Sequence, residues 1–298
     1  MERRAEATPH KRACFFLLMF MLIHILSGRL LGLFSIITPY AETALALVIS
    51  SLAVIIPYLR FMKRTPKALL MRKRIKKIAP PEAIAWFFMG ICANCALTMV
   101  NMPVNLFWQR MGMITQTVNT PHGTAEYMLG ILCICIVPAV CEELLCRGLV
   151  LGEYETYGRK SALFISALMF SLLHRDITSA VMTFLLGLML AYIVFMSGSI
   201  VPAMIFHFSV NFFSLSMGYV SENIIPPHVM PDFSLALNIG TLLLALTFVI
   251  AALTAVFGGR NVLKTNRHGT RVKYGFCISL IVLLAIYVQN AVWAIFGI

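Results

Sequence analysis

Charged residues are scarce in this chain, because they make up 12% of its 298 residues against about 25% in ordinary soluble domains. Hydrophobic residues make up 60%, which is more than one soluble core of this size can bury. We find no internal repeat and no low-complexity tract, and we expect no cleavable signal peptide. These features exclude a soluble globule, a disordered chain and a disulfide scaffold. They indicate a polytopic membrane protein.

Acidic residues are also few, with 12 Asp and Glu against 24 Lys and Arg, so the net charge is +12. Most basic residues fall into four groups: before the first apolar segment, between Arg60 and Lys77, around 147–160, and between Arg260 and Lys273. Such segregation is typical of cytoplasmic loops, so we favour membrane topology over nucleic-acid binding as its cause. We therefore expect a cytoplasmic N-terminus. Because the chain has no long soluble loop, we also expect a bacterial plasma membrane.

Apolar segments long enough to cross a bilayer recur along the chain, where about 20 residues are needed for one crossing. The candidate spans are 14–38, 41–59, 82–104, 126–150, 161–175, 178–197, 200–220, 234–257 and 275–296. If every one of these segments crosses the membrane, the chain has nine spans. Eight is the alternative, because Gly28 and Arg29 interrupt the first span and the fifth is short. The sequence thus predicts an all-α bundle of eight or nine transmembrane helices, forming a single membrane domain over residues 1–298.

Charges inside such spans are costly, about 2.5–3.5 kcal/mol each, so they mark candidate functional positions. Glu143 and Arg147 are spaced i,i+4, the arrangement in which an acid and a following base pair well on a helix. Glu142 points about 100° away from Glu143 on the same helix. It has no local cation, and apolar surroundings make a carboxylate more basic, which suits a general base. The alternative interpretation is a pair of interfacial glutamates.

Two histidines and an asparagine complete the polar set in the middle of the chain. His174 ends an apolar stretch that begins near Phe170, and taken alone it is typical of an interfacial residue. His207 and Asn211 share one face of an apolar helix, and taken alone they are typical of helix–helix hydrogen bonding. Together with the glutamates, these residues supply a base, two imidazoles, an amide and an orienting ion pair. That combination indicates a hydrolase.

The three clusters form an ordered pattern, EExxxR, FxxxH and HxxxN, within residues 126–214. This pattern resembles the signature of the CPBP family, the Abi-like CAAX-processing and bacteriocin-processing intramembrane endopeptidases. One departure is Cys146, which stands before the arginine where the family usually has an aromatic residue. The resemblance implies a catalytic core at 126–214 inside the membrane domain.

The resemblance also implies hydrolysis of a peptide bond within or at the edge of the membrane. Glu142 would activate water with help from His174, while His207 and Asn211 would stabilise the tetrahedral oxyanion. Glu143 and Arg147 would be the structural ion pair at the site. The implied partners are a membrane-associated protein or peptide substrate and the lipid bilayer, without nucleic acid.

Three alternatives stay open on the sequence. Glu142, His174 and His207 are enough ligands for a catalytic zinc, although the chain has no HExxH motif, so we favour no cofactor over a divalent metal such as zinc. A non-catalytic membrane scaffold or immunity protein could keep the same residues as contacts between helices. A proton-coupled transporter is less favoured, because we find no inverted repeats.

Overall fold

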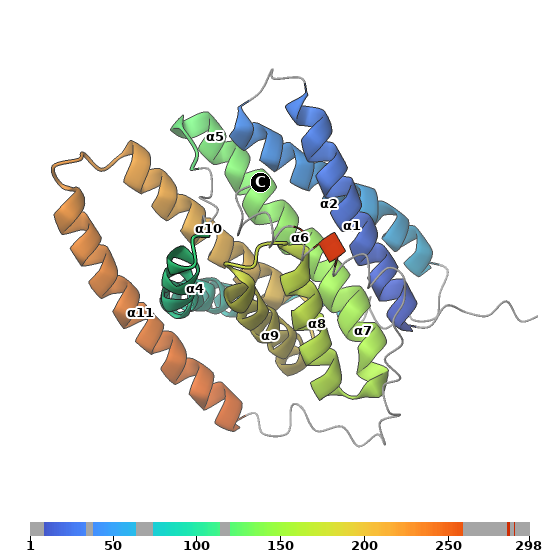
Figure 1. Cartoon of the computed structure of the whole chain (residues 1–298). Helices are drawn as coiled ribbons and strands as arrows, with labels where there is room; N and C mark the ends of the chain where they lie inside the picture. The colour runs from blue at the N-terminus through green and yellow to red at the C-terminus, as the bar shows by residue number, and fades with distance from the viewer. Residues whose placement is uncertain are drawn as a thin grey trace, which may run out of the picture.

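The computed structural model describes residues 9–33, 38–63, 74–113 and 120–258, together with 285, 286 and 289. Within this part of the chain every regular element is a helix and there is no strand, which confirms the all-α class (Figure 1). The first elements are α1 (Pro9–Gly32), α2 (Pro39–Lys63), α4 (Pro80–Arg110), α5 (Gly123–Gly130), η1 (Ile131–Ile136), α6 (Val137–Glu143) and η2 (Leu144–Val150). They are followed by α7 (Leu151–Tyr154), η3 (Glu155–Tyr157), α8 (Arg159–Leu173), α9 (Ala180–Ser197), α10 (Val201–Asn223) and α11 (Met230–Gly258).

Six helical segments of the described chain are long and apolar enough to cross a membrane, as expected for a multi-pass membrane protein. They are Cys14–Gly32, Pro80–Arg110, Gly123–Tyr157, Ala180–Ser197, Val201–Asn223 and Met230–Ala255. The count of eight or nine is not confirmed. The apolar part of α2 and the whole of α8 are too short, and the span expected at 275–296 lies outside the described residues apart from three positions.

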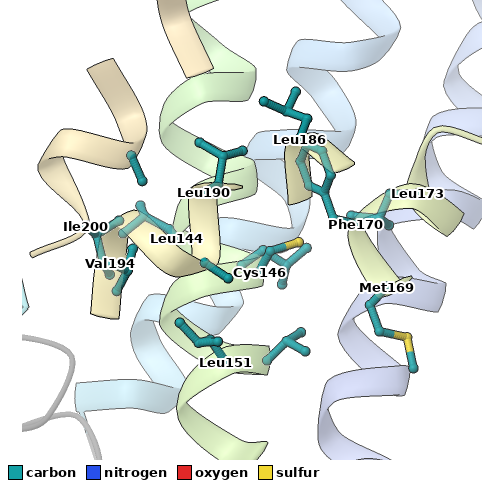
Figure 2. Close-up of a cluster of buried hydrophobic side chains, with 14 of the residues drawn as sticks. Leu144, Cys146, Leu151, Met169, Phe170, Leu173, Leu186, Leu190, Val194 and Ile200 are labelled. Atoms are coloured by element: carbon teal, nitrogen blue, oxygen red, sulfur yellow. The ribbon is translucent and has the colours of Figure 1, made fainter. Parts of the chain in front are cut away.

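The continuous run from α5 to η3 is the most buried of the six segments, with 61% of its most apolar stretch inside the protein. Its second half packs against α8 and α9, where Leu144, Phe170 and Leu190 belong to one buried apolar cluster (Figure 2). In Figure 1 these helices occupy the middle of the molecule, with α11 at its edge. The residues of the EExxxR motif therefore lie on the central helix run.

This central run departs from α-helical geometry twice, because η1 and η2 are π-helical turns on either side of α6. Pro138 contributes to the first departure. In an α-helix the carbonyl of Ile134 would accept the N–H of residue 138, which proline lacks. Side chains from neighbouring helices bind carbonyls in both turns: the Asn211 amide donates to Ile134 at 3.1 Å, and the Ser166 hydroxyl donates to Cys146 at 3.1 Å. π-turns of this kind occur frequently at functional sites.

Helices α8 and α9 form a closely packed hairpin. A Cβ atom added to Gly187 of α9 would stand 2.8 Å from the Cα of Ala167 in α8, so only glycine allows this approach. Since α8 has 15 residues, it is about 22 Å long, which is short of the roughly 30 Å hydrocarbon core. The connection from His174 to Ser179 therefore follows a helix that cannot cross the membrane by itself.

Candidate active site

Glu143 lies at the centre of a buried polar cluster. Its Oε1 accepts a hydrogen bond from Arg147 Nη1 at 3.0 Å, and both side chains are fully buried. The same oxygen lies 3.1 Å from Nδ1 of His207, which reaches it from α10. The ion pair expected from the i,i+4 spacing is thus present, and it also holds an imidazole from a helix 64 residues away in sequence.

The guanidinium of Arg147 has two further neighbours, a backbone carbonyl and an aromatic ring. Its Nη2 donates to the carbonyl of Gly187 in α9 at 3.0 Å. The ring of Phe170 in α8 lies 4.5 Å below the guanidinium, in cation–π contact. The same ring meets the His207 ring edge-on, with centroids 5.5 Å apart. Arg147 therefore connects the central run to α8, α9 and α10 at one point.

His174 lies at the C-terminal end of α8, beside this cluster. Its Nδ1 lies 2.9 Å from the carbonyl of Phe170, and since a carbonyl only accepts, Nδ1 carries the proton. Nε2 is then left with its lone pair, and the side chain is exposed. His174 thus offers an available base on the open side of a cluster whose other ionisable residues are buried.

Glu142 is buried, with 6% of its surface exposed, but it does not join the ion pair next to it. Its Oε2 has no hydrogen-bond partner in the described part of the chain. His207 and Arg147 lie within electrostatic reach of its carboxyl group. A buried carboxylate oxygen without a protein donor is costly, and such an atom is a natural place for water to bind.

Asn211 does not turn its amide toward the ion pair. One N–H of the amide donates to the carbonyl of Ile134 in η1, where Pro138 has removed the helical donor. The structure therefore brings Glu142, Glu143, Arg147, His174 and His207 together, and it uses Asn211 to bind α10 to the central run. The second N–H of the amide remains for another acceptor.

The central part of the chain matches a known family. Residues 124–213 match the model of the Rce1-like family, described as type II CAAX prenyl endopeptidase Rce1-like. This segment is Rce1-like. The match confirms the resemblance to CAAX-processing proteases that the three motifs indicated, and it includes all of the site residues. No curated protein matches the chain, and no solved structure does either.

The Rce1-like segment does not gather a metal-binding set. Among the described residues, no three His, Cys, Asp or Glu side chains are placed so that they could hold one ion. This includes Glu142, His174 and His207, the zinc ligands considered from the sequence.

Sequence reasoning missed one contributor to the Rce1-like site. The Gly187 carbonyl binds Arg147, and a backbone oxygen has no signature in a residue pattern.

Proposed function

We propose that the chain is an intramembrane endopeptidase that hydrolyses a peptide bond in a membrane-associated substrate, without a metal cofactor. The observation that carries this proposal is the convergence of the three motifs on one buried cluster inside the Rce1-like segment. The proposed reaction needs no cofactor, because the side chains present supply a base, an orienting ion pair and N–H donors.

The proposed reaction begins at Glu142 and His174. Glu142 accepts a proton from water, and the water oxygen attacks the scissile carbonyl to form a tetrahedral oxyanion. His174, with Nδ1–H on Phe170 and Nε2 available, orients the same water. The proton then passes from Glu142 to the amide nitrogen as the C–N bond breaks. The products are a carboxylate on one fragment and an amine on the other.

His207 and Asn211 are the proposed oxyanion donors. Each already makes one protein hydrogen bond, His207 through Nδ1 to Glu143 and Asn211 through one N–H to Ile134. Asn211 keeps a second N–H that can face the oxyanion, and His207 can donate from Nε2 only in its imidazolium form, because its Nδ1 proton is given to Glu143. Fixed donors stabilise the developing charge most strongly, since they need no reorganisation during the reaction. Glu143 and Arg147 act as the structural pair that holds His207.

The scaffold alternative makes a different use of the same residues. It accounts well for Asn211, which binds helix to helix, and for Asn94, whose amide donates to Val210 and Ser214 of α10 at 3.1 and 2.7 Å. It leaves Glu142 without a role, because this buried carboxylate takes part in no ion pair among the described residues, unlike Glu143. We therefore favour the enzyme.

The decisive experiment compares cells that carry the wild-type chain with cells that carry Glu142→Gln. We expect peptides released by the wild type to be missing from the variant, and their uncleaved precursors to accumulate in its membranes, by mass spectrometry of both fractions. Equal amounts of membrane-inserted protein in the two strains provide the control. Identical peptidomes at equal expression would refute the proposal.

The absence of a metal requirement is a separate prediction. Purified active protein should keep its activity after dialysis against a chelator, because the proposed base is a carboxylate and the oxyanion donors are protein N–H groups. Elemental analysis of the same sample gives the metal content. Stoichiometric zinc, with activity lost on stripping and regained on adding zinc, would contradict the metal-free mechanism.

We also propose the finer topology: eight or nine transmembrane helices in a bacterial plasma membrane, with the N-terminus in the cytoplasm. The supporting feature is the segregation of basic residues into four groups. The group at 260–273 lies outside the described residues, as do four of the nine basic residues between Arg60 and Lys77.

A further inference from the structure

A short non-helical strap, residues 74–79, leads into α4 and is bound to the turn between α9 and α10. The N–H of Ile200 donates to the carbonyl of Arg74 at 2.8 Å. Ser199 binds the backbone of Lys76 twice, because its Oγ accepts the Lys76 N–H at 3.3 Å and its hydroxyl donates to the Lys76 carbonyl at 3.2 Å. The strap contributes only backbone atoms to these bonds, so its path is fixed while its side chains stay available.

An ion pair attaches the same strap to a second turn, the one between η3 and α8. Arg74 forms an ion pair with Glu155, and the other carboxylate oxygen of Glu155 lies 3.5 Å from Nε of Arg159. Because Arg74 contacts both turns, the strap and the two turns lie side by side at this end of the bundle. We call residues 74–79, 155–160 and 197–200 together the strap surface.

The strap surface carries an excess of positive charge. Its one acidic residue, Glu155, faces five basic ones: Arg74, Lys76, Lys77, Arg159 and Lys160. The three lysines are exposed, and none of them forms an ion pair within the described part of the chain. Glu82 follows in the first turn of α4, where the indole of Trp86 donates to it at 3.4 Å. The lysines are therefore available to an anion from outside the chain.

The position of the strap surface fits the headgroup level of a bilayer. The strap leads directly into α4, and the α9–α10 turn joins two more helices that are long and apolar enough to cross a membrane. Ile75 is 53% exposed between Arg74 and Lys76, and an apolar side chain among cations suits the boundary between headgroups and acyl chains. A water-soluble anion would neutralise the lysines and leave Ile75 in water, whereas a lipid offers a partner to both.

We propose that the strap surface binds the headgroups of anionic phospholipids through Lys76, Lys77 and Lys160, with Ile75 against the acyl chains. The fixed strap gathers these cations before a lipid arrives, so binding costs less conformational entropy than it would on a free linker. The bound lipid also stabilises the α9–α10 turn, from which α10 carries His207 into the buried cluster. The inference goes beyond the proposed peptidase activity and does not rest on it.

The test measures binding of short-chain phosphatidylglycerol and phosphatidylcholine to the purified full-length chain in a neutral detergent. We expect the wild type to prefer phosphatidylglycerol. Each of Lys76→Gln, Lys77→Gln and Lys160→Gln should weaken this preference about fivefold, the effect of one basic residue near an anionic membrane surface. High salt should weaken it too. Arg110→Gln, which removes an exposed positive charge from the opposite end of α4, should leave it intact.

Ser199→Ala separates the shape of the strap surface from its charge. This variant loses both Ser199 bonds to Lys76 and keeps every basic residue, so we expect a weaker preference for phosphatidylglycerol. Ser216→Ala is the matched control, because it removes a hydroxyl from the far half of α10 and should not change the preference.

Several outcomes would overturn the inference. These are equal binding of the two lipids to the wild type, or a preference that survives when all three lysines are replaced. An unchanged preference in Ser199→Ala would show that the docked strap does not form the site. Competition by inorganic phosphate at the concentration of the lipid would assign the surface to a water-soluble anion instead. Because this assay measures no turnover, its failure leaves the peptidase proposal standing, and identical peptidomes would leave the lipid result in place.

Discussion

At the scale of single residues, two adjacent glutamates have opposite environments. Oε1 of Glu143 is shared between Arg147 and His207, whereas Glu142 makes no ion pair among the described residues; Oε2 of each carboxylate has no hydrogen-bond partner there. The difference follows from the helix, because neighbouring side chains point about 100° apart and only one of them can face α10. This difference supports the proposed division of roles between the two carboxylates.

This division predicts different consequences for folding. Arg147→Ala leaves the buried carboxylate of Glu143 with one partner fewer, and breaking a buried pair typically costs about 3–5 kcal/mol. We expect this variant to express poorly and to unfold at a much lower temperature in detergent.

Glu142→Gln is the matched control, since it removes a charge that makes no ion pair and keeps the side-chain shape. It should unfold within a few degrees of the wild type. Equal thermal stability of the two variants would show that Glu143 and Arg147 do not form the structural pair.

Sequence reasoning at this scale succeeded where the partners are local. The spacing of Glu143 and Arg147 was enough to predict their contact, because i and i+4 are neighbours on any helix. The contact of His207 with Glu143 joins residues 64 positions apart and depends on how α10 packs against α6, which no spacing encodes. Asn211 shares the face of His207, as expected, yet its hydrogen bond to Ile134 follows from a π-turn that the sequence did not reveal.

At the scale of elements, the α8–α9 hairpin positions the arginine. Gly187 lets α9 approach Ala167, and the same residue offers its carbonyl to Arg147. The packing of two helices and the orientation of the central guanidinium are therefore set by one glycine.

We expect Gly187→Ala to lower both stability and activity. The new methyl group would meet the Ala167 backbone, and overpacking of this kind costs about 1–3 kcal/mol. Separation of the helices would also draw the carbonyl away from Arg147. Thermal unfolding and peptide release should fall together.

Gly152→Ala provides the comparison on α7, because a Cβ there has nothing within 4 Å. Alanine is the better helix former, so this variant should be as stable as the wild type or more so. Destabilisation of Gly152→Ala to the same degree would show that helix–helix approach at Gly187 is not the cause.

Hydropathy predicted the positions of the helices well, but it did not predict their local helix type. Eight of the nine predicted spans correspond to helices in the structure, and the short fifth span corresponds to the short α8. The π-turns around α6 were not predicted, since an apolar run such as ILCICI has the same hydropathy in either helical form. Local helix type depends on Pro138 and on donors from other helices.

At the scale of the whole molecule, charge distribution determines the expected orientation. Lys77 is exposed just before α4, and His228 is exposed in the connection between α10 and α11. With a cytoplasmic N-terminus, a cysteine at position 77 should be shielded from a membrane-impermeant thiol reagent added outside. A cysteine at 228 should react.

Positions 70 and 265 extend the same labelling test to loops outside the described residues, where we also expect protection from outside. Permeabilised cells provide the control, because all four positions should then react. Labelling of position 70 or 77 in intact cells would overturn the orientation.

Composition was sufficient for the overall class and insufficient for the helix count. A chain with 60% hydrophobic residues had to bury them in lipid, so the all-α membrane class followed directly. The count depends on whether short apolar helices such as α8 lie within the membrane, and their hydropathy does not decide this. What decides it is the packing of α8 against α9 and η2.

The shortness of α8 has a consequence for how the chain is made. A segment of 15 residues that is followed by His-Arg-Asp gives the insertion machinery a weak signal, whereas the 18 residues of α9 carry no charge. If α8 lies in the membrane, we expect it to depend on α9 during synthesis and to insert together with α9 as one hairpin. Ribosome stalling before residue 197 should then leave a chain in which Arg147 does not yet bind the Gly187 carbonyl, so we expect the proposed active site to assemble late in biogenesis.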